Sequence, residues 1–122
     1  MKQNALIVYS RSFGDTLCST PTLRKLYNIY NSKLVVITEK PEIFYGNPYV
    51  SETHLLDEFS DDELNLKFNV HKTFNNISSA DSNGIQLKHP LVDLRQIHAL
   101  SLGFTLLPEE LGCDFYPGEK YQ

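Results

Sequence analysis

The sequence lacks the features of several large protein classes. Its only two cysteines, Cys18 and Cys113, lie far apart and do not have the paired spacing of a zinc site, so we expect small packing residues rather than a metal or disulfide framework. No stretch approaches the roughly 18 consecutive apolar residues of a membrane helix. The start has no apolar signal core followed by a cleavage site. These absences predict a cytoplasmic protein.

Basic residues are also scarce. The 11 lysines and arginines are outnumbered by 15 acidic residues, the net charge is −4, and no dense basic run occurs. Nucleic acid is therefore not an expected partner. The charge is uneven, because residues 1–40 contain six bases and two acids whereas residues 41–122 contain five bases and thirteen acids. The N-terminal third can present a mildly positive face that suits an anionic small molecule or headgroup.

Short apolar runs alternate with helical periodicity in the first third of the chain. Residues 5–9 form a continuous apolar run, typical of a central parallel strand covered on both faces. A polar turn over 10–16 leads into a helical pattern that includes residues 23–30, and a second run follows at 33–38. The connection is long enough for the right-handed crossover that parallel pairing requires. The pattern predicts a β-α-β unit and a parallel sheet.

The start of the first helix is left open by the sequence. Pro21 fits the first turn of a helix that Thr20 caps. It equally fits a kink in a longer helix that starts near Asp15. Both alternatives place the polar turn directly before a helical segment.

The middle and the end of the chain continue the alternation. We expect one or two helical turns over 41–46, a strand over 53–56, a short helix over 58–66, a more exposed strand over 68–74 and a loop over 75–88. A last helix opens at Pro90 and ends at Gly103, with an apolar set of Leu91, Leu94, Ile97, His98 and Leu102.

These elements predict an α/β fold, a three-layer Rossmann-like domain with a mainly parallel sheet. We assign residues 1–107 to that domain. Residues 108–122 are rich in proline, glycine and charge and have no periodicity, so we interpret them as a tail or the start of a linker. No internal repeat or low-complexity tract is evident.

The polar loop after the first strand is the candidate site, because open α/β sheets bind ligands at the carboxyl edge of their strands. Backbone N–H groups at the following helix start favour negative charge, which fits either a bound phosphate or the carboxylate of Asp15. The two uses compete, since a fixed carboxylate repels a pyrophosphate. The loop also lacks the G-x-G-x-x-G and G-x-x-x-x-G-K-[ST] patterns of nucleotide sites. We therefore interpret Asp15 as a proton acceptor.

Each residue of this loop also has a plain structural interpretation. Asp15 can cap the helix, which is the commoner job of an aspartate at such a position. Arg11 steers an anionic ligand or pairs with an acid such as Asp15. Ser10 and Ser12 bind a ligand or satisfy the backbone of the turn. Phe13 forms a wall of the site or anchors in the core.

The four histidines do not predict a metal site. They share no short ligand spacing, and none has a cysteine or a second histidine four residues on. His98 lies on the apolar face of the last helix, where we expect a partly buried packing residue. Scattered residues of this kind give no reason to predict a Ser-His-Asp triad.

Several segments of the sequence resemble a known family. Residues 5–26, with the strand, the S-x-G-D loop and the T-P-x-L-R helix, resemble the opening of family 9 glycosyltransferases, the ADP-heptose:lipopolysaccharide heptosyltransferases. Residues 34–39 and 46–50 are similar to the second strand and the N-P-Y-V turn of that family, and 98–103 are similar to the end of its N-terminal domain. The resemblance spans nearly the whole chain, and residues 10–26 and 46–50 carry its specific motifs.

The resemblance implies a fold and a reaction. Such enzymes have two Rossmann-like domains in the GT-B arrangement, the first holding the acceptor sugar and the second the nucleotide sugar, and this chain corresponds to the first. The family carboxylate that activates the acceptor hydroxyl maps onto Asp15, which implies inverting transfer without a required metal or cofactor. The acceptor-binding residues that we assign around it are Ser10, Arg11, Ser12, Phe13 and Gly14.

The implied partners follow from the same resemblance. They are a sugar or glycolipid acceptor, such as lipopolysaccharide, and a nucleotide-sugar donor that binds only when a second domain is present. A peripheral membrane contact and a homo-oligomer or partner chain that supplies the missing half also belong to this hypothesis. The 122-residue chain alone is expected to bind donor poorly and to have little transferase activity. The family often has a basic residue where Tyr9 stands, and this departure and the negative net charge set the chain apart.

Two other functions remain open. Residues 8–16 also resemble the loop that wraps flavin phosphate in flavodoxin-like electron carriers. The carboxylate of Asp15 beside a phosphate opposes that hypothesis, and residues 47–50 have no counterpart in that fold. The third possibility is a non-catalytic remnant that binds a sugar or another protein.

Overall fold

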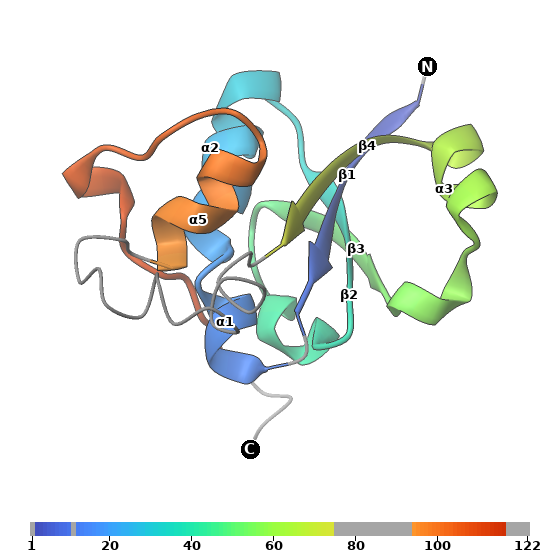
Figure 1. The fold of residues 1–122 in the computed structure, drawn as a ribbon, viewed down its shortest axis with the longest axis horizontal. Coiled ribbons are helices and arrows are strands. Elements are labelled where there is room, and N and C mark those ends of the chain that lie inside the picture. Colours follow the sequence, from blue (N-terminus) through green and yellow to red (C-terminus); the bar gives the residue numbers. More distant parts are fainter. Residues whose placement is uncertain (1, 11, 75–93, 117–122) are drawn as a thin grey trace, which may run out of the picture.

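A computed structural model describes residues 2–10, 12–74 and 94–116 of the chain (Figure 1). The four strands of this part are β1 (Gln3–Tyr9), β2 (Leu34–Thr38), β3 (Val50–His54) and β4 (Phe68–Phe74). They form one sheet in the order β3-β2-β1-β4, and every neighbouring pair is parallel. The helices are α1 (Phe13–Leu17), α2 (Thr20–Tyr30), α3 (Asp61–Lys67) and α5 (Leu94–Ser101), with 3₁₀ helices η1 (Pro41–Phe44), η2 (Leu56–Glu58) and η4 (Pro108–Glu110).

Helices cover both faces of the sheet, with α2 and α5 on one side and α3 on the other (Figure 1). Successive side chains of a strand point to opposite faces, so β1 contributes to two cores. Leu6 and Val8 pack with Leu23 of α2 in the first core. Ala5 and Ile7 belong to the second core, on the α3 side. The structure thus confirms the α/β Rossmann-like fold with a parallel sheet between two helical layers.

The order of the strands creates a switch point at β1. The chain proceeds outward from β1 through β2 to β3, and then returns through α3 to place β4 on the other side of β1. The strand order therefore reverses between β1 and β4. In open α/β sheets, ligands bind at the carboxyl ends of the strands where the strand order reverses.

The choice between one helix and two after β1 is resolved as two. The short α1 ends at Leu17, and α2 begins at Thr20 with Ser19 at the N-cap position. Pro21 lies in the first turn of α2, where its missing N–H costs nothing. Thr20 is therefore the first helical residue rather than the cap, and its hydroxyl donates to the carbonyl of Leu17 at 2.9 Å.

The predicted third strand, 53–56, was placed too far along the chain, because β3 spans Val50–His54. The side chain of Asn47 accepts a hydrogen bond from Tyr49 N–H at 2.9 Å and forms the turn before the strand. At the other end, the Glu58 carboxylate accepts from Leu55 N–H at 3.0 Å, so Leu55 belongs to the start of η2. Local side-chain caps decide both boundaries.

The predicted helix over 58–66 begins three residues later, at Asp61. Ser60 and Glu63 form a capping box: the Ser60 hydroxyl accepts from Glu63 N–H at 3.2 Å, and the Glu63 carboxylate accepts from Ser60 N–H at 3.0 Å. The strand that follows, β4, occupies the predicted residues 68–74.

The last helix ends as predicted. Gly103 has φ +90°, its N–H donates to the Leu100 carbonyl at 3.0 Å, and Phe104 N–H donates to the Ala99 carbonyl at 3.2 Å. This is the Schellman arrangement, in which glycine adopts the left-handed conformation without a Cβ clash. The predicted loop over 75–88 and the predicted helix start at Pro90 lie outside the described residues.

Residues 108–116 lie against α2. The guanidinium of Arg24 contacts the Asp114 carboxylate at 2.6 Å and donates to the Glu110 carbonyl at 2.6 Å. Lys25 pairs with the Glu110 carboxylate at 2.9 Å, and Asp114 N–H donates to the Thr20 hydroxyl at 2.8 Å. The assignment of 108–122 as a tail or linker stays a prediction. Among the described helices, none combines the length and apolar character needed to cross a membrane.

Candidate functional site

The candidate site lies at the carboxyl ends of β1 and β4. Ser10 directly follows β1, Asp15 belongs to α1, and Thr73 is near the end of β4. His98 comes from α5, which packs against β4. Three parts of the chain that are distant in the sequence therefore meet at the switch point of the sheet.

The side chain of Asp15 does not cap α1. Ser12 is the N-cap, and its hydroxyl accepts a hydrogen bond from Asp15 N–H at 3.1 Å. Asp15 is the third residue of the helix, so the expectation that it caps α1 is wrong. Its carboxylate is directed to other donors.

Two side chains donate to the two oxygens of the Asp15 carboxylate. The Ser10 hydroxyl donates to Oδ2 at 3.0 Å, and the Nε2 atom of His98 lies 3.1 Å from Oδ1. The same Nε2 atom lies 3.0 Å from the backbone carbonyl oxygen of Asp15. The side chain of Asp15 is 14% exposed, so an oriented carboxylate remains in contact with solvent at the edge of the sheet.

His98 is the main residue that the sequence did not identify as part of the site. We expected a partly buried packing residue, but the ring is fully buried and both nitrogens have polar partners. Its Nδ1 atom lies 3.0 Å from the hydroxyl of Thr73, which is also fully buried and was not predicted. The signal in the sequence was a single polar ring on an apolar helix face, because a buried polar group needs partners.

The other predicted loop residues have mixed outcomes. Ser10 contacts the Asp15 carboxylate as described, whereas the hydroxyl of Ser12 is used by the backbone. Apart from its chain neighbours and the backbone of α1, no atom of the described residues lies within 4 Å of the position that a Cβ on Gly14 would take, so this side of α1 is open. Arg11 lies outside the described residues. The assignment of these residues to acceptor binding stays a prediction.

Phe13 is not a core anchor. Its side chain is 44% exposed, and its ring packs edge to face against Phe115 with 5.6 Å between the ring centroids. Phe115 is also exposed, so the two rings form an aromatic surface at the start of α1. Phe13 can therefore serve as a wall for a ligand beside this loop.

Two other histidines of the described chain have partners of their own. His54 contacts the carboxylates of Glu58 at 2.8 Å and Glu52 at 3.4 Å. His71 lies 3.1 Å from the Asn4 side-chain oxygen, and burial lowers the pKa of His71. Within the described ranges, no three His, Cys, Asp or Glu residues are grouped so that they could hold a metal ion.

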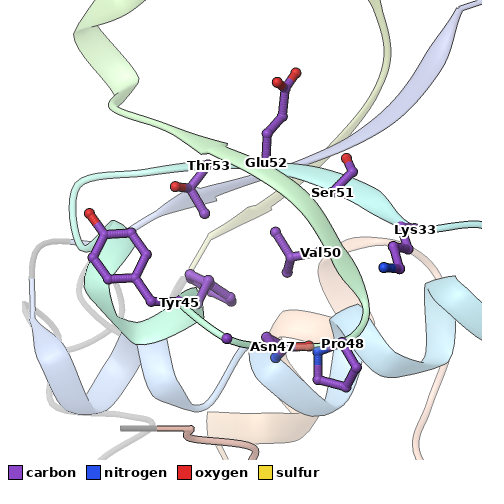
Figure 2. Close-up of a pocket in the computed structure, with 10 residues that line it drawn as sticks. Lys33, Tyr45, Asn47, Pro48, Val50, Ser51, Glu52 and Thr53 are labelled. Carbon is purple, nitrogen blue, oxygen red and sulfur yellow. The ribbon is translucent and has the colours of Figure 1, made fainter. Parts of the chain in front are cut away.

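Pockets lined only by described residues include two of about 400 Å³ each. One lies at the carboxyl ends of β2 and β3 and is lined by Glu39, Leu55, Leu56 and Asp57. The other runs along the outer strand β3 (Figure 2), between that strand and the turn that contains Asn47. Figure 2 shows Tyr45 and Asn47 on one side of β3 and the Glu52 carboxylate pointing away from them. Neither pocket includes Asp15.

Comparison of the chain with family models, with curated proteins and with solved structures gave no match. The resemblance to family 9 glycosyltransferases therefore rests on the motifs in the sequence. The fold and the hydrogen bonds around Asp15 are independent of that resemblance, and they restrict which chemistry the site can support.

Proposed function

We propose that this chain is the acceptor-side domain of an inverting glycosyltransferase in which Asp15 is the general base. The observation that carries the proposal is the position of the Asp15 carboxylate and its hydrogen bonds. It is held by Ser10 and His98, it keeps contact with solvent, and it lies at the switch point of a parallel sheet. A base must be oriented in this way before it can take a proton from a bound hydroxyl.

The proposed reaction follows from this geometry and from the S-x-G-D resemblance. Asp15 takes the proton of an acceptor hydroxyl while the hydroxyl oxygen attacks the anomeric carbon of the donor. The new C–O bond forms on one face as the bond to the nucleoside diphosphate breaks on the other, and the leaving group takes the electron pair. The result is inversion at the anomeric carbon.

The negative charge of Asp15 favours an acceptor site over a donor site. A carboxylate in the first turn of α1 repels a diphosphate that approaches the same helix end. In our proposal the diphosphate is bound by a second domain of the GT-B arrangement, and the acceptor occupies this edge of the sheet. The exposed rings of Phe13 and Phe115 give the acceptor an apolar surface beside the carboxylate.

The proposal includes the partners that the resemblance implies. They are a sugar or glycolipid acceptor in the cytoplasm, with peripheral membrane contact where the acceptor is a lipid. The second half of the enzyme comes from the same polypeptide, from another copy or from a partner chain. By the same charge argument, a flavodoxin-like carrier would need the flavin phosphate where Asp15 lies, so we prefer the transferase.

The test is a transfer assay on the full-length product of the gene that encodes this chain. ADP-heptose and a panel of other nucleotide sugars are supplied as donors, with lipopolysaccharide core that lacks heptose as the acceptor. We expect a glycosylated product whose new linkage has the anomeric configuration opposite to that of the donor, as read by NMR.

Two outcomes would contradict the proposal. A flavin absorption spectrum in the purified protein would favour the electron carrier. Acceptor binding without transfer from any donor of the panel would favour a non-catalytic binding domain.

A further inference from the structure

We propose that His98 is a positioning residue for Asp15, with its proton on Nε2 and with Thr73 holding the opposite side of the ring. The inference rests on the proposed function where it concerns catalysis by Asp15. The position of the proton and the contact with the carboxylate do not depend on that function.

The acceptors around His98 determine which nitrogen carries the proton. Nε2 lies 3.0 Å from the backbone carbonyl oxygen of Asp15, and a carbonyl oxygen can only accept a hydrogen bond. Nε2 must therefore be the donor. In the neutral ring Nδ1 is then an acceptor, and the hydroxyl of Thr73, 3.0 Å away, is the group that donates to it.

The single Nε2–H group contacts both the backbone and the side chain of Asp15. The carbonyl oxygen lies at 3.0 Å and Oδ1 at 3.1 Å, so the proton is shared between them. This shared bond fixes the side-chain torsions of Asp15 relative to its own backbone. The Ser10 hydroxyl holds Oδ2 from the other side. The carboxylate is thereby oriented before any acceptor binds, which is how positioned groups accelerate a reaction.

The ring itself is held by a rigid element. His98 lies between Ile97 and Ala99, both buried, and α5 is ended by the left-handed Gly103. Because His98 and Thr73 are fully buried, the ring cannot turn without displacing packed neighbours. Side chains carried by packed helices and strands place reacting groups more accurately than loops do. In this site α5 and β4 together position a carboxylate that itself belongs to the short helix α1.

The first arm of the test is ¹⁵N NMR of the histidine rings in the 122-residue chain under mildly alkaline conditions, where the neutral ring is the form to be examined. We expect His98 to show one tautomer, with a protonated Nε2 and an unprotonated Nδ1. A protonated Nδ1, or an equal mixture of tautomers, would overturn the inference without any reference to enzyme activity.

The second arm compares His98→Gln with His98→Leu. The amide of glutamine can donate from nearly the position of Nε2, whereas leucine fills the space without a donor. We expect the ¹³Cγ signal of Asp15 to stay close to wild type in His98→Gln and to move in His98→Leu. An unchanged Asp15 signal in a folded His98→Leu variant would overturn the inference.

The third arm measures kinetics in the full-length gene product. We expect His98→Leu to lower kcat by up to about 100-fold, the usual cost of a misplaced catalytic group, while the acceptor KM changes only a few-fold. His98→Gln should recover most of the loss, which general destabilisation would not explain. Unchanged kcat in His98→Leu would refute the catalytic part. Absence of transfer in the wild type would refute the proposed function and leave the first two arms valid.

Discussion

Two parts of the motif segment 10–26 have different roles, although both carry the resemblance. In the S-x-G-D part, the Asp15 carboxylate faces solvent at the sheet edge and accepts hydrogen bonds from Ser10 and His98. In the T-P-x-L-R part, Arg24 is engaged within the chain, by Asp114 and by the Glu110 carbonyl. Within one short segment, a partly exposed carboxylate at the sheet edge is therefore followed by an arginine that binds residues 108–116 to α2.

The largest expected difference between the two parts is in catalysis. Asp15→Asn keeps the size and the hydrogen-bonding oxygen but removes the base, so kcat in the transfer assay should fall by about 10²–10⁴. The acceptor KM should change much less, because the base acts in the transition state. Asp62→Asn, at an exposed carboxylate of α3, is the matched control and should keep wild-type kcat. Equal losses in kcat and acceptor affinity would count against the base.

The next difference is in stability. Arg24→Ala removes two charge-assisted hydrogen bonds and leaves the Asp114 carboxylate, whose side chain is only 17% exposed, without this partner. We expect the free energy of unfolding in urea to fall by about 2 kcal/mol. Asp15→Asn, whose amide oxygen can still accept from His98, should cost less than about 1 kcal/mol. If Asp15→Asn is the more destabilising change, the roles assigned to the two parts are wrong.

A smaller effect is expected at Thr73. Thr73→Val keeps the shape of the side chain but leaves Nδ1 of His98 without its hydroxyl donor. The free energy of unfolding should fall by about 1 kcal/mol. Thr73→Ser retains the hydroxyl and serves as the control for hydrogen bonding. A loss in Thr73→Ser as large as that in Thr73→Val would mean that the methyl group, rather than the hydroxyl, is what matters.

The smallest expected effect is on how stability changes with pH. It concerns Glu110, which binds residues 108–116 to Lys25 of α2. Hydrogen bonds from Leu107 N–H and then from Lys25 hold the pKa of Glu110 below its ordinary value of 4.5. A lowered folded-state pKa gives stability that is present above the ordinary value and is lost as the pH falls through the folded one. The melting temperatures of wild type and Glu110→Gln should therefore differ slightly at neutral pH, and the difference should shrink as the pH falls below the ordinary carboxyl value of 4.5. A difference that widens with acid would contradict this sign.

The sheet was predictable because its signals are local. The continuous apolar run at residues 5–9 and the run rich in branched residues at 33–38 correspond to strands β1 and β2, as expected for parallel strands covered on both faces. The alternation over 68–74 gave β4. The end of β3 was predicted wrongly because Leu55 is apolar and fits a strand. In the structure the N–H of Leu55 instead donates to the Glu58 carboxylate, which caps η2. Apolar character alone does not reveal a cap that is formed three residues away.

The candidate site was only half predictable. Asp15 and Ser10 follow a buried strand, and that local context indicates the sheet edge. His98 is 83 residues from Asp15, and nothing in the local sequence connects the two. The role of Ser12 was also ambiguous, because serine and aspartate both cap helices. Only the structure shows that the hydroxyl of Ser12 accepts the hydrogen bond from the Asp15 N–H.

The most direct test of the central claim is a crystal structure of the full-length gene product with an acceptor bound. We predict that the reacting hydroxyl oxygen lies about 2.6–3.2 Å from a carboxylate oxygen of Asp15. An acceptor bound along β3 in the pocket of Figure 2, with its hydroxyls out of reach of Asp15, would contradict the account.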